Sequence, residues 1–360
     1  MNLRPSDYEP DELPGRSTRR QNAKRGAIPA PFGGYAATAH SSGRAKSVAL
    51  HLHVMKQRQK VRMTGGAGAA DASFGDGLAA AARAIIADGR HALTDPELTG
   101  PEAVHEVRKA LKRWRALLRL LARPLGEQAD QLRTEARELM RAVAGARDAQ
   151  SALDALADLR KAELPFSAAS TETIRARLTE VRDAAGATSF TKSLRDRISR
   201  YLDYATLSLE RWPLKAIDFD TVTDGLTSTY RRARQLVPDG WPAAEAEHLH
   251  DLRRRVVEHR HQMDLIEPLW PRLGRVWAEE AQRLRNQLGC CQDLAVLTSF
   301  AAPHQPLAPW RSRLTPLIEA RRNAHLKTAA RLAGRLFAEK PKAFRRRIAA
   351  LWSARDPKNH

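Results

Sequence analysis

The sequence predicts an all-α protein. Apolar residues recur at three- and four-residue spacing from about residue 76 onward, which is the pattern of amphipathic helices. No convincing alternating strand occurs, and no Asn-Gly hairpin turn is flanked by β-branched runs. One helical stretch also repeats 145 residues later.

The elements follow one another along the chain with few interruptions. Residues 1–75 are rich in Gly, Pro, Ser and basic residues and lack apolar periodicity, so they are predicted to form a disordered basic tail. One ordered domain is expected over residues 76–355. Pro101 lies near the start of one helix, and Pro124 with Gly126 ends it. Helical periodicity covers residues 78–93, 101–126, 127–145, 146–164, 188–212 and 221–241.

The repeat relates residues 104–148 to residues 249–293 without a gap. A register held over roughly 45 residues, with His and Asp at both ends, indicates two copies of one helical unit. The first copy is expected to span about residues 76–238 and the second about residues 240–355. Matched pairs include His105 with His250, Arg108 with Arg253, Lys109 with Arg254, Arg115 with Arg260, and Asp148 with Asp293.

The first copy has one apolar and one cationic face. On a helical wheel, His105 shares an arc of roughly 100° with the cations Arg108, Lys109, Lys112 and Arg119. The opposite arc holds Val104, Val107, Leu111, Trp114, Leu117, Leu118 and Leu121. Like charges four residues apart repel each other on a helix. Two such faces are therefore expected to meet around one groove that an extended polyanion stabilises.

The charge of the whole chain points the same way. Lys and Arg number 61 against 41 Asp and Glu, which gives a formal charge of +20 and a pI of about 10.7. This excess indicates nucleic acid, an anionic membrane surface or a phosphate polymer as partner. The two cysteines, Cys290 and Cys291, are adjacent and offer no disulfide framework. Without a secretory signal or an apolar run of about 18 residues, we expect a cytoplasmic protein with no membrane span.

Several motifs together resemble a known family. V-H-x-x-R-K-x-x-K-R-W-R at 104–115, its second copy at 249–260, ARDAQSAL and CCQDLAVL resemble the CHAD family, the conserved histidine α-helical domain. YRRAR at 230–234 is similar to a further basic stretch of that family. The resemblance implies two pseudo-symmetric four-helix bundles that form one domain around a basic cleft. It also implies non-catalytic binding of inorganic polyphosphate, with polyphosphate granules as a cellular location.

The resemblance and the helical wheel together define a candidate polyphosphate site. The second copy departs from the motif, because Val257 and Glu258 replace Lys112 and Arg113, and neither is included in the predicted site. Arg255 replaces Ala110 on the packing side, and His259 replaces Trp114. The candidate residues are His105, Arg108, Lys109, Lys112, Arg113, Arg115, Arg119, His250, Arg253, Arg254, Arg260, Arg231 and Arg234.

Other functions are less well supported by the sequence. We expect no metal and no cofactor: HEVRK has Lys109 where a zinc-protease helix needs its second His. Without a Gly-rich phosphate loop or a nucleophile elbow, no enzyme is expected, and Asp148 and Asp293 are interpreted as helix caps.

Nucleic acid remains the alternative partner. Aromatic residues make up only 6% of the chain, and Trp114, Trp270 and Trp277 are predicted to serve packing rather than base stacking. The role of His105 and His250 stays open between charging near anions and bracing the helix start.

Overall fold

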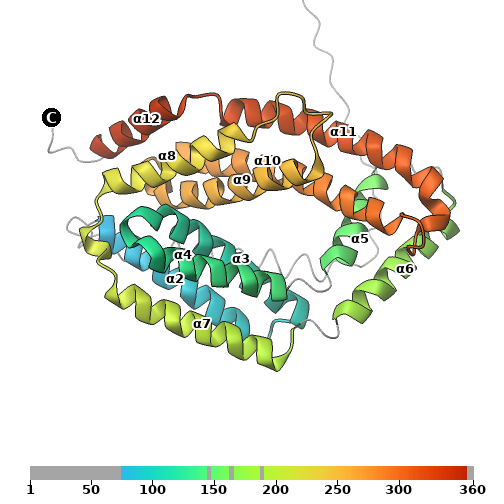
Figure 1. The fold of residues 1–360 in the computed structure, drawn as a ribbon, viewed down its shortest axis with the longest axis horizontal. Coiled ribbons are helices and arrows are strands. Elements are labelled where there is room, and N and C mark those ends of the chain that lie inside the picture. Colours follow the sequence, from blue (N-terminus) through green and yellow to red (C-terminus); the bar gives the residue numbers. More distant parts are fainter. Residues whose placement is uncertain (1–73, 144–146, 162–165, 187–189, 355–360) are drawn as a thin grey trace, which may run out of the picture. The chain divides into compact units, whose positions relative to one another are not determined.

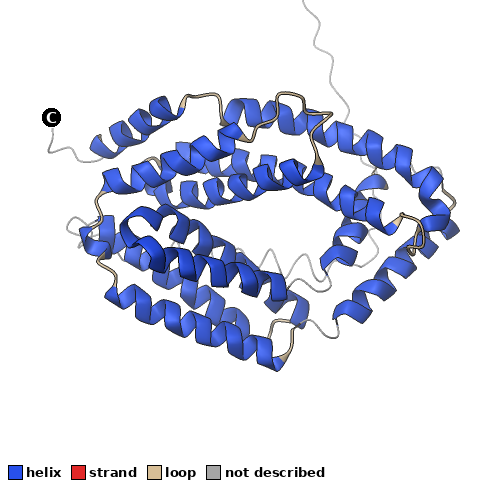
Figure 2. Cartoon of the chain, in the orientation of Figure 1, coloured by secondary structure: helices blue, strands red, loops and turns tan. Residues whose placement is uncertain are grey.

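A computed structural model describes residues 74–143, 147–161, 166–186 and 190–354. Within these residues every regular element is a helix, so the predicted fold class is confirmed (Figure 2). The predicted tail lies outside the described residues, except that Phe74 and Gly75 begin the first helix. The α-helices are α2 (Phe74–Thr94), α3 (Gly100–Leu120), α4 (Ala122–Ala142), α5 (Arg147–Leu159), α6 (Ala168–Gly186), α7 (Lys192–Arg211), α8 (Phe219–Gln235), α9 (Ala246–Ile266), α10 (Pro271–Phe300), α11 (Arg311–Leu336) and α12 (Pro341–Ser353).

The repeat extends to the helices themselves. Phe219 begins α8, 145 residues after Phe74 begins α2, and α9 starts 146 residues after α3. The long helix α10 takes the place of α4 and α5 together. This register assigns α8 to the second unit, whereas the sequence analysis placed the division near residue 239. The difference arises because α2 and α8 have hardly any residues in common at this offset, so only the helix bounds show the match.

The helices pack as two groups with a common core. Helices α2, α3, α4 and α7 form one group, and α8, α9, α10 and α12 form the other, with α11 along α10 (Figure 1). Between the groups, α3 packs against α9 and α8. Leu117 of α3, Leu226 of α8 and Leu252 of α9 are fully buried in one apolar cluster that includes both groups. The predicted bundles therefore share their core, and the helices with the repeated cationic motif lie side by side.

A second, smaller core lies at the other end of α10. It joins Leu156 of α5 and Ile174 of α6 to Leu294 of α10 and Leu314 of α11. Helix α5 packs on α10, α6 and α11. This cluster positions α5, and with it Arg147, beside the second half of the repeat.

Helix α3 owes its orientation to its caps and its apolar stripe. The backbone N–H of Thr99 donates to the Glu102 carboxylate at 3.0 Å, and Pro101 occupies the first turn. The buried Trp114 indole donates a hydrogen bond to the Tyr201 hydroxyl at 2.8 Å. The Tyr201 hydroxyl in turn donates to the Leu132 carbonyl at 2.8 Å. Because this chain links α3, α7 and α4 through the core, it sets the rotation of α3 about its axis. The cationic face consequently points away from α7.

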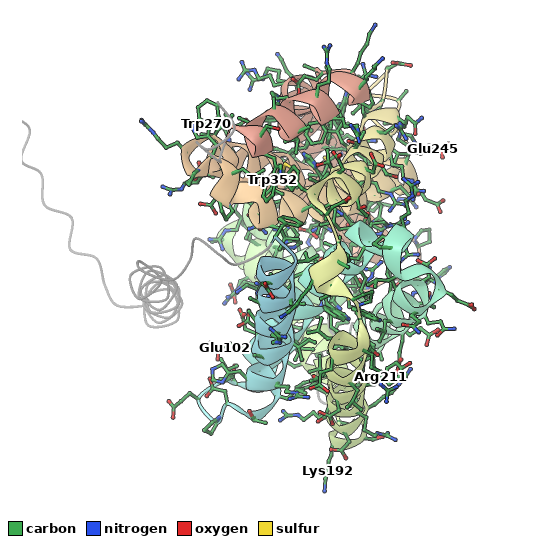
Figure 3. All side chains as sticks on the ribbon, turned by 90° about the vertical axis from the view of Figure 1, so that its left-hand side faces the viewer. Glu102, Lys192, Arg211, Glu245, Trp270 and Trp352 are labelled. Atoms are coloured by element: carbon green, nitrogen blue, oxygen red, sulfur yellow. The ribbon has the colours of Figure 1, made fainter. Side chains whose placement is uncertain are left out.

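The tryptophans confirm the packing prediction only in part. Trp114 is 1% exposed, and Trp277 is half-buried beneath the Arg347 guanidinium, 4.0 Å from its ring centroid. Trp270, by contrast, is 50% exposed at the start of α10, at the edge of the fold in Figure 3. The prediction for Trp270 was wrong because this residue lies at the corner where α9 meets α10. None of the helices in the described ranges is long and apolar enough to cross a membrane.

Candidate functional site

Five cations from four helices crowd together where α3 faces the second half of the chain. We call them the inner cationic cluster: Arg108 and Lys112 of α3, Arg147 of α5, Arg253 of α9 and Arg285 of α10. The charges of all four arginines act on Lys112 and lower its pKa. Two of the five, Arg108 and Arg253, are the matched pair of the sequence repeat. The fold thus brings together positions that are 145 residues apart.

The pKa of Lys112 shows the effect of these surroundings. Its pKa falls from 10.5 to about 7, first because burial penalises the charged ammonium and second because of the four arginines. A lysine with this pKa is only about half charged at neutral pH. In the free protein at neutral pH, the five basic groups of the inner cationic cluster are therefore not all fully protonated.

Arg108 and Arg253 have similar surroundings. Burial lowers the pKa of each to about 10, and the Arg147 charge adds to the effect in both cases. Arg108 Nη1 donates to the Met140 carbonyl at 2.7 Å, and Arg253 Nη1 donates to the Gln292 amide oxygen at 2.6 Å. Both acceptors are neutral, so they orient the guanidinium groups without cancelling their charge.

A single acid acts on the second half of the inner cluster. Asp293 raises the pKa of both Arg253 and Arg285, while burial raises the pKa of Asp293 itself. Asp293 lies in the interior of α10, so the prediction that it caps a helix was wrong. In the first copy Asp148 lies in the first turn of α5, whereas in the second copy Asp293 lies within the 30-residue helix α10.

The cationic face of α3 continues past Lys112 to Arg115 and Arg119, which we call the outer arginines. Burial lowers the pKa of both, to about 10 for Arg119. Glu258 of α9 opposes this effect in each case, and its carboxylate Oε2 lies 3.8 Å from Arg119 Nε. The outer arginines therefore face an acid that the sequence analysis left out of the site.

Several predicted site residues have acidic partners of their own. On α3, Lys109 pairs with Glu106 and Arg113 with Asp88 of α2. On α9, Arg254 pairs with Asp251 and Arg260 with Asp264. These four cations are thus partly neutralised by neighbouring acids.

The basic stretch of α8 contributes a different residue from those predicted. Arg234 Nε donates to the Phe337 carbonyl at 3.0 Å, which ties α8 to the end of α11. Arg231 is exposed, and its charge is not among those that lower the pKa of the outer arginines. Arg232, the residue between them, does act on Arg119.

The histidines differ in surroundings. His105 lies on the exposed side of α3. Its pKa is lowered by partial burial of the imidazole and by neighbouring cations that include Arg285 of α10, so it faces the inner cluster. His250 is half-buried, and its Nδ1 has no hydrogen-bond partner among the described residues. His259 is 2% exposed among Tyr230, Phe337 and other rings, where burial lowers its pKa to about 4. His259 thus serves the core as a neutral ring.

Sequence reasoning missed Arg147 and Arg285, which come from α5 and α10. The repeat register held a partial signal, because Arg147 aligns with Gln292 and Arg285 aligns with Met140. In each pair one member is a cation and the other contacts Arg108 or Arg253. Only the packing of α5 and α10 around α3 reveals that both arginines face one space.

One group of potential metal ligands occurs among the described residues. Asp158, Cys290 and His325 bring ligand atoms within 4.8 Å of one another. The Asp158 carboxylate, however, already accepts two hydrogen bonds from Arg321 at 2.8 Å and contacts His325 Nε2 at 2.7 Å. A guanidinium so close disfavours a bound cation. The group is better explained as an ion-pair network that joins α5 to α11.

The predicted basic cleft stays a prediction. Surface hollows of the described residues include one lined by Arg160, Thr171 and Glu172 and another lined by Glu127, Arg197 and their neighbours. Neither hollow includes a residue of the inner cationic cluster. Charge and burial, rather than a measured cavity, define the candidate site.

Comparisons with known proteins agree with the motifs. A family model described as the CHAD domain matches residues 76–302. The chain is also similar to the crystal structure of the CHAD domain from the plant Ricinus communis, at 18% sequence identity and a TM-score of 0.49. That match covers 78% of this chain and 93% of the other. Among curated proteins, none matches this sequence.

Proposed function

Because this chain belongs to the CHAD domain family, we propose that its inner cationic cluster binds inorganic polyphosphate without converting it. The observation that carries the proposal is the meeting of five cations from four helices, where burial and four neighbouring arginines lower the pKa of Lys112 to about 7. Crowding of this kind destabilises the free protein and is relieved by a ligand with several negative charges. An extended phosphate chain can contact cations from α3, α5, α9 and α10 at once.

The chemistry of the side chains favours phosphate. A guanidinium offers a planar pair of N–H donors to two phosphate oxygens, whereas an ammonium supplies a point charge. Arg108 and Arg253 each use one nitrogen on a neutral acceptor, which leaves further N–H donors for a ligand. Binding through such contacts releases counterions and weakens steeply with salt.

Nucleic acid offers the same phosphate chemistry and is the competing ligand in the first test. Sequence-tolerant binding of single strands also uses aromatic platforms among the cations. Trp114, the tryptophan nearest the cationic face in sequence, is buried and bonded to Tyr201. Titration of the purified protein with long-chain polyphosphate and with RNA of equal phosphate number decides between them. Tighter binding of RNA at moderate salt would overturn the preference for polyphosphate.

The second test removes the central arginines. The double variant Arg108→Ala with Arg253→Ala is expected to weaken polyphosphate binding about 100-fold, or roughly 2.7 kcal/mol. The slope of log affinity against log salt should also fall by about 1 to 2. Lys192→Ala with Arg211→Ala removes two exposed cations of α7, labelled in Figure 3, and serves as the matched control. Equal losses in both double variants would show that net charge alone drives binding.

Two further experiments address the rest of the proposal. Deletion of residues 1–73 is expected to weaken binding less than the double substitution, and the opposite ranking would place the site in that segment. We also propose that the protein is cytoplasmic and gathers at polyphosphate granules. A fluorescent fusion should lose granule localisation in the Arg108→Ala, Arg253→Ala variant, and polyphosphate incubated with the protein should keep its length.

A further inference from the structure

Glu258 is a buried acid in a strongly cationic region. It is 8% exposed on α9, and its Oε2 accepts a hydrogen bond from Arg255 Nη1 at 2.8 Å. The same oxygen lies 3.8 Å from Arg119 Nε of α3. Arg255, which the sequence analysis assigned to packing, is thus one of its partners. Glu258 lies on α9, which packs beside α3 (Figure 1).

The charge of Glu258 supports the outer arginines. Besides burial, every leading charge that acts on Arg115 or Arg119 belongs to another arginine and lowers the pKa, except that of Glu258. The opposing arginines come from α4, α8 and α9: Arg133, Arg137, Arg232, Arg254 and Arg255. Glu258 therefore stabilises these arginines as a bound phosphate would.

The two members of the inner cationic cluster on α3, Arg108 and Lys112, lack such a partner. The cluster's arginines Arg108 and Arg253 donate to neutral oxygens. No carboxylate is among the leading influences on Arg108 or Lys112. The carboxylate of Asp293 acts on the cluster from α10, where it raises the pKa of Arg253 and Arg285. A polyanion that follows α3 from its N-terminal half thus meets unneutralised cations first and a fixed negative charge afterwards.

We propose that Glu258 is a specificity-determining residue that ends the phosphate-binding row at Arg115 and Arg119. This inference rests on the proposed function. The Glu258 carboxylate takes the place of a ligand phosphate beside the outer arginines. Its negative charge also repels a phosphate chain that extends past Lys112. The row from Lys112 to Arg119 covers about 10 Å of helix at 1.5 Å per residue. Removal of this one charge opens that length to ligand, so Glu258 limits how much of a long chain the protein binds.

Glu258→Gln tests the inference, because the amide keeps the size of the side chain and one acceptor for Arg255. Binding of long-chain polyphosphate is expected to tighten about tenfold, which is about 1.4 kcal/mol. Binding of tripolyphosphate, which has only three phosphates, should change less than about twofold. Calorimetric titration should also show more phosphates bound per protein at saturation.

Two variants control for charge and folding. Glu106→Gln removes an acid from the same face of α3 that pairs with Lys109, and it should leave the ratio of long-chain to tripolyphosphate affinity unchanged. Glu258→Asp keeps the charge and should behave as wild type even if Glu258→Gln is unstable. Circular dichroism and thermal unfolding verify that each variant is folded.

The outcomes separate the two proposals. If the wild type binds neither phosphate ligand, the proposed function fails, and the role of Glu258 with it. If the wild type binds and Glu258→Gln raises the affinity for both ligands equally, or for neither, then Glu258 does not set the end of the site. If Glu258→Asp, which keeps the charge, gained affinity for the long chain as Glu258→Gln does, the inference would likewise be overturned. A gain confined to the long chain supports it.

Discussion

Polyphosphate binding is expected to take up a proton at Lys112. In the free protein the pKa of Lys112 is lowered to about 7 by burial and by four arginines. A phosphate chain brings negative charge next to the ammonium and raises that pKa again. The binding-competent form is the protonated one. Affinity is therefore full below about pH 6 and falls as the pH rises through the free-protein value.

The magnitude follows from the two pKa values. The change from 10.5 to about 7 corresponds to about 5 kcal/mol against the charged form, which is the upper limit of what a ligand can restore. At about pH 8.5, only about 3% of Lys112 is charged before binding, so close to one proton is taken up per site. At about pH 6, uptake falls to about one tenth of a proton. Affinity should weaken up to about tenfold per pH unit between pH 7.5 and 9.

Isothermal titration calorimetry measures this uptake directly. The observed enthalpy at fixed pH depends linearly on the ionisation enthalpy of the buffer, for example Tris and Hepes, with a slope equal to the protons exchanged. Lys112→Arg keeps a charged group at about pH 8.5 and should bind polyphosphate with almost no proton uptake. Lys112→Met should show no uptake and weaker binding, while the exposed Lys192→Arg on α7 should behave as wild type. Tight binding by the wild type without proton uptake would refute this reasoning, as would equal uptake by Lys112→Arg.

Three other predictions concern the core and the site. His259 is buried with its pKa lowered to about 4, so stability is full above about pH 6.5 and falls as the pH drops toward 4. His259→Phe should remove about 2 kcal/mol of that loss at about pH 5 in denaturant unfolding, and an unchanged pH profile would contradict it. Asp158→Asn breaks the buried network of α5 and α11 and should cost about 3–5 kcal/mol. Glu172→Gln in an exposed pair should cost far less, and similar costs would refute the network. A Cβ on Gly289 would lie 3.3 Å from the Arg253 guanidinium, so Gly289→Ala should weaken polyphosphate binding about threefold or more. Gly334→Ala, where an added Cβ has no atom within 4 Å, should leave binding unchanged. Equal affinities of the two variants would argue against this contact.

The sequence by itself determined the helices and their faces. The period of 3.6 residues is a local property of the backbone, so Val107, Leu111 and Trp114 could be assigned to the core and Lys112 to the opposite face. The repeat also identified Arg108 and Arg253 as equivalent, and the structure places both in one cluster. These conclusions needed only the spacing of residues within a helix and the match between two stretches.

Only the tertiary structure decided which of the charged faces share a space. Arg147 and Arg285 belong to the cluster because of how α5 and α10 pack in the fold. Arg113, a predicted site residue, instead forms an ion pair with Asp88 of α2. Glu258 was left out of the predicted site, yet it lies against the outer arginines. Partner choice of this kind depends on contacts between different helices, which the spacing of residues within one helix does not determine. A helical wheel gives the direction of a side chain, whereas its neighbours are set by the packing of the whole core.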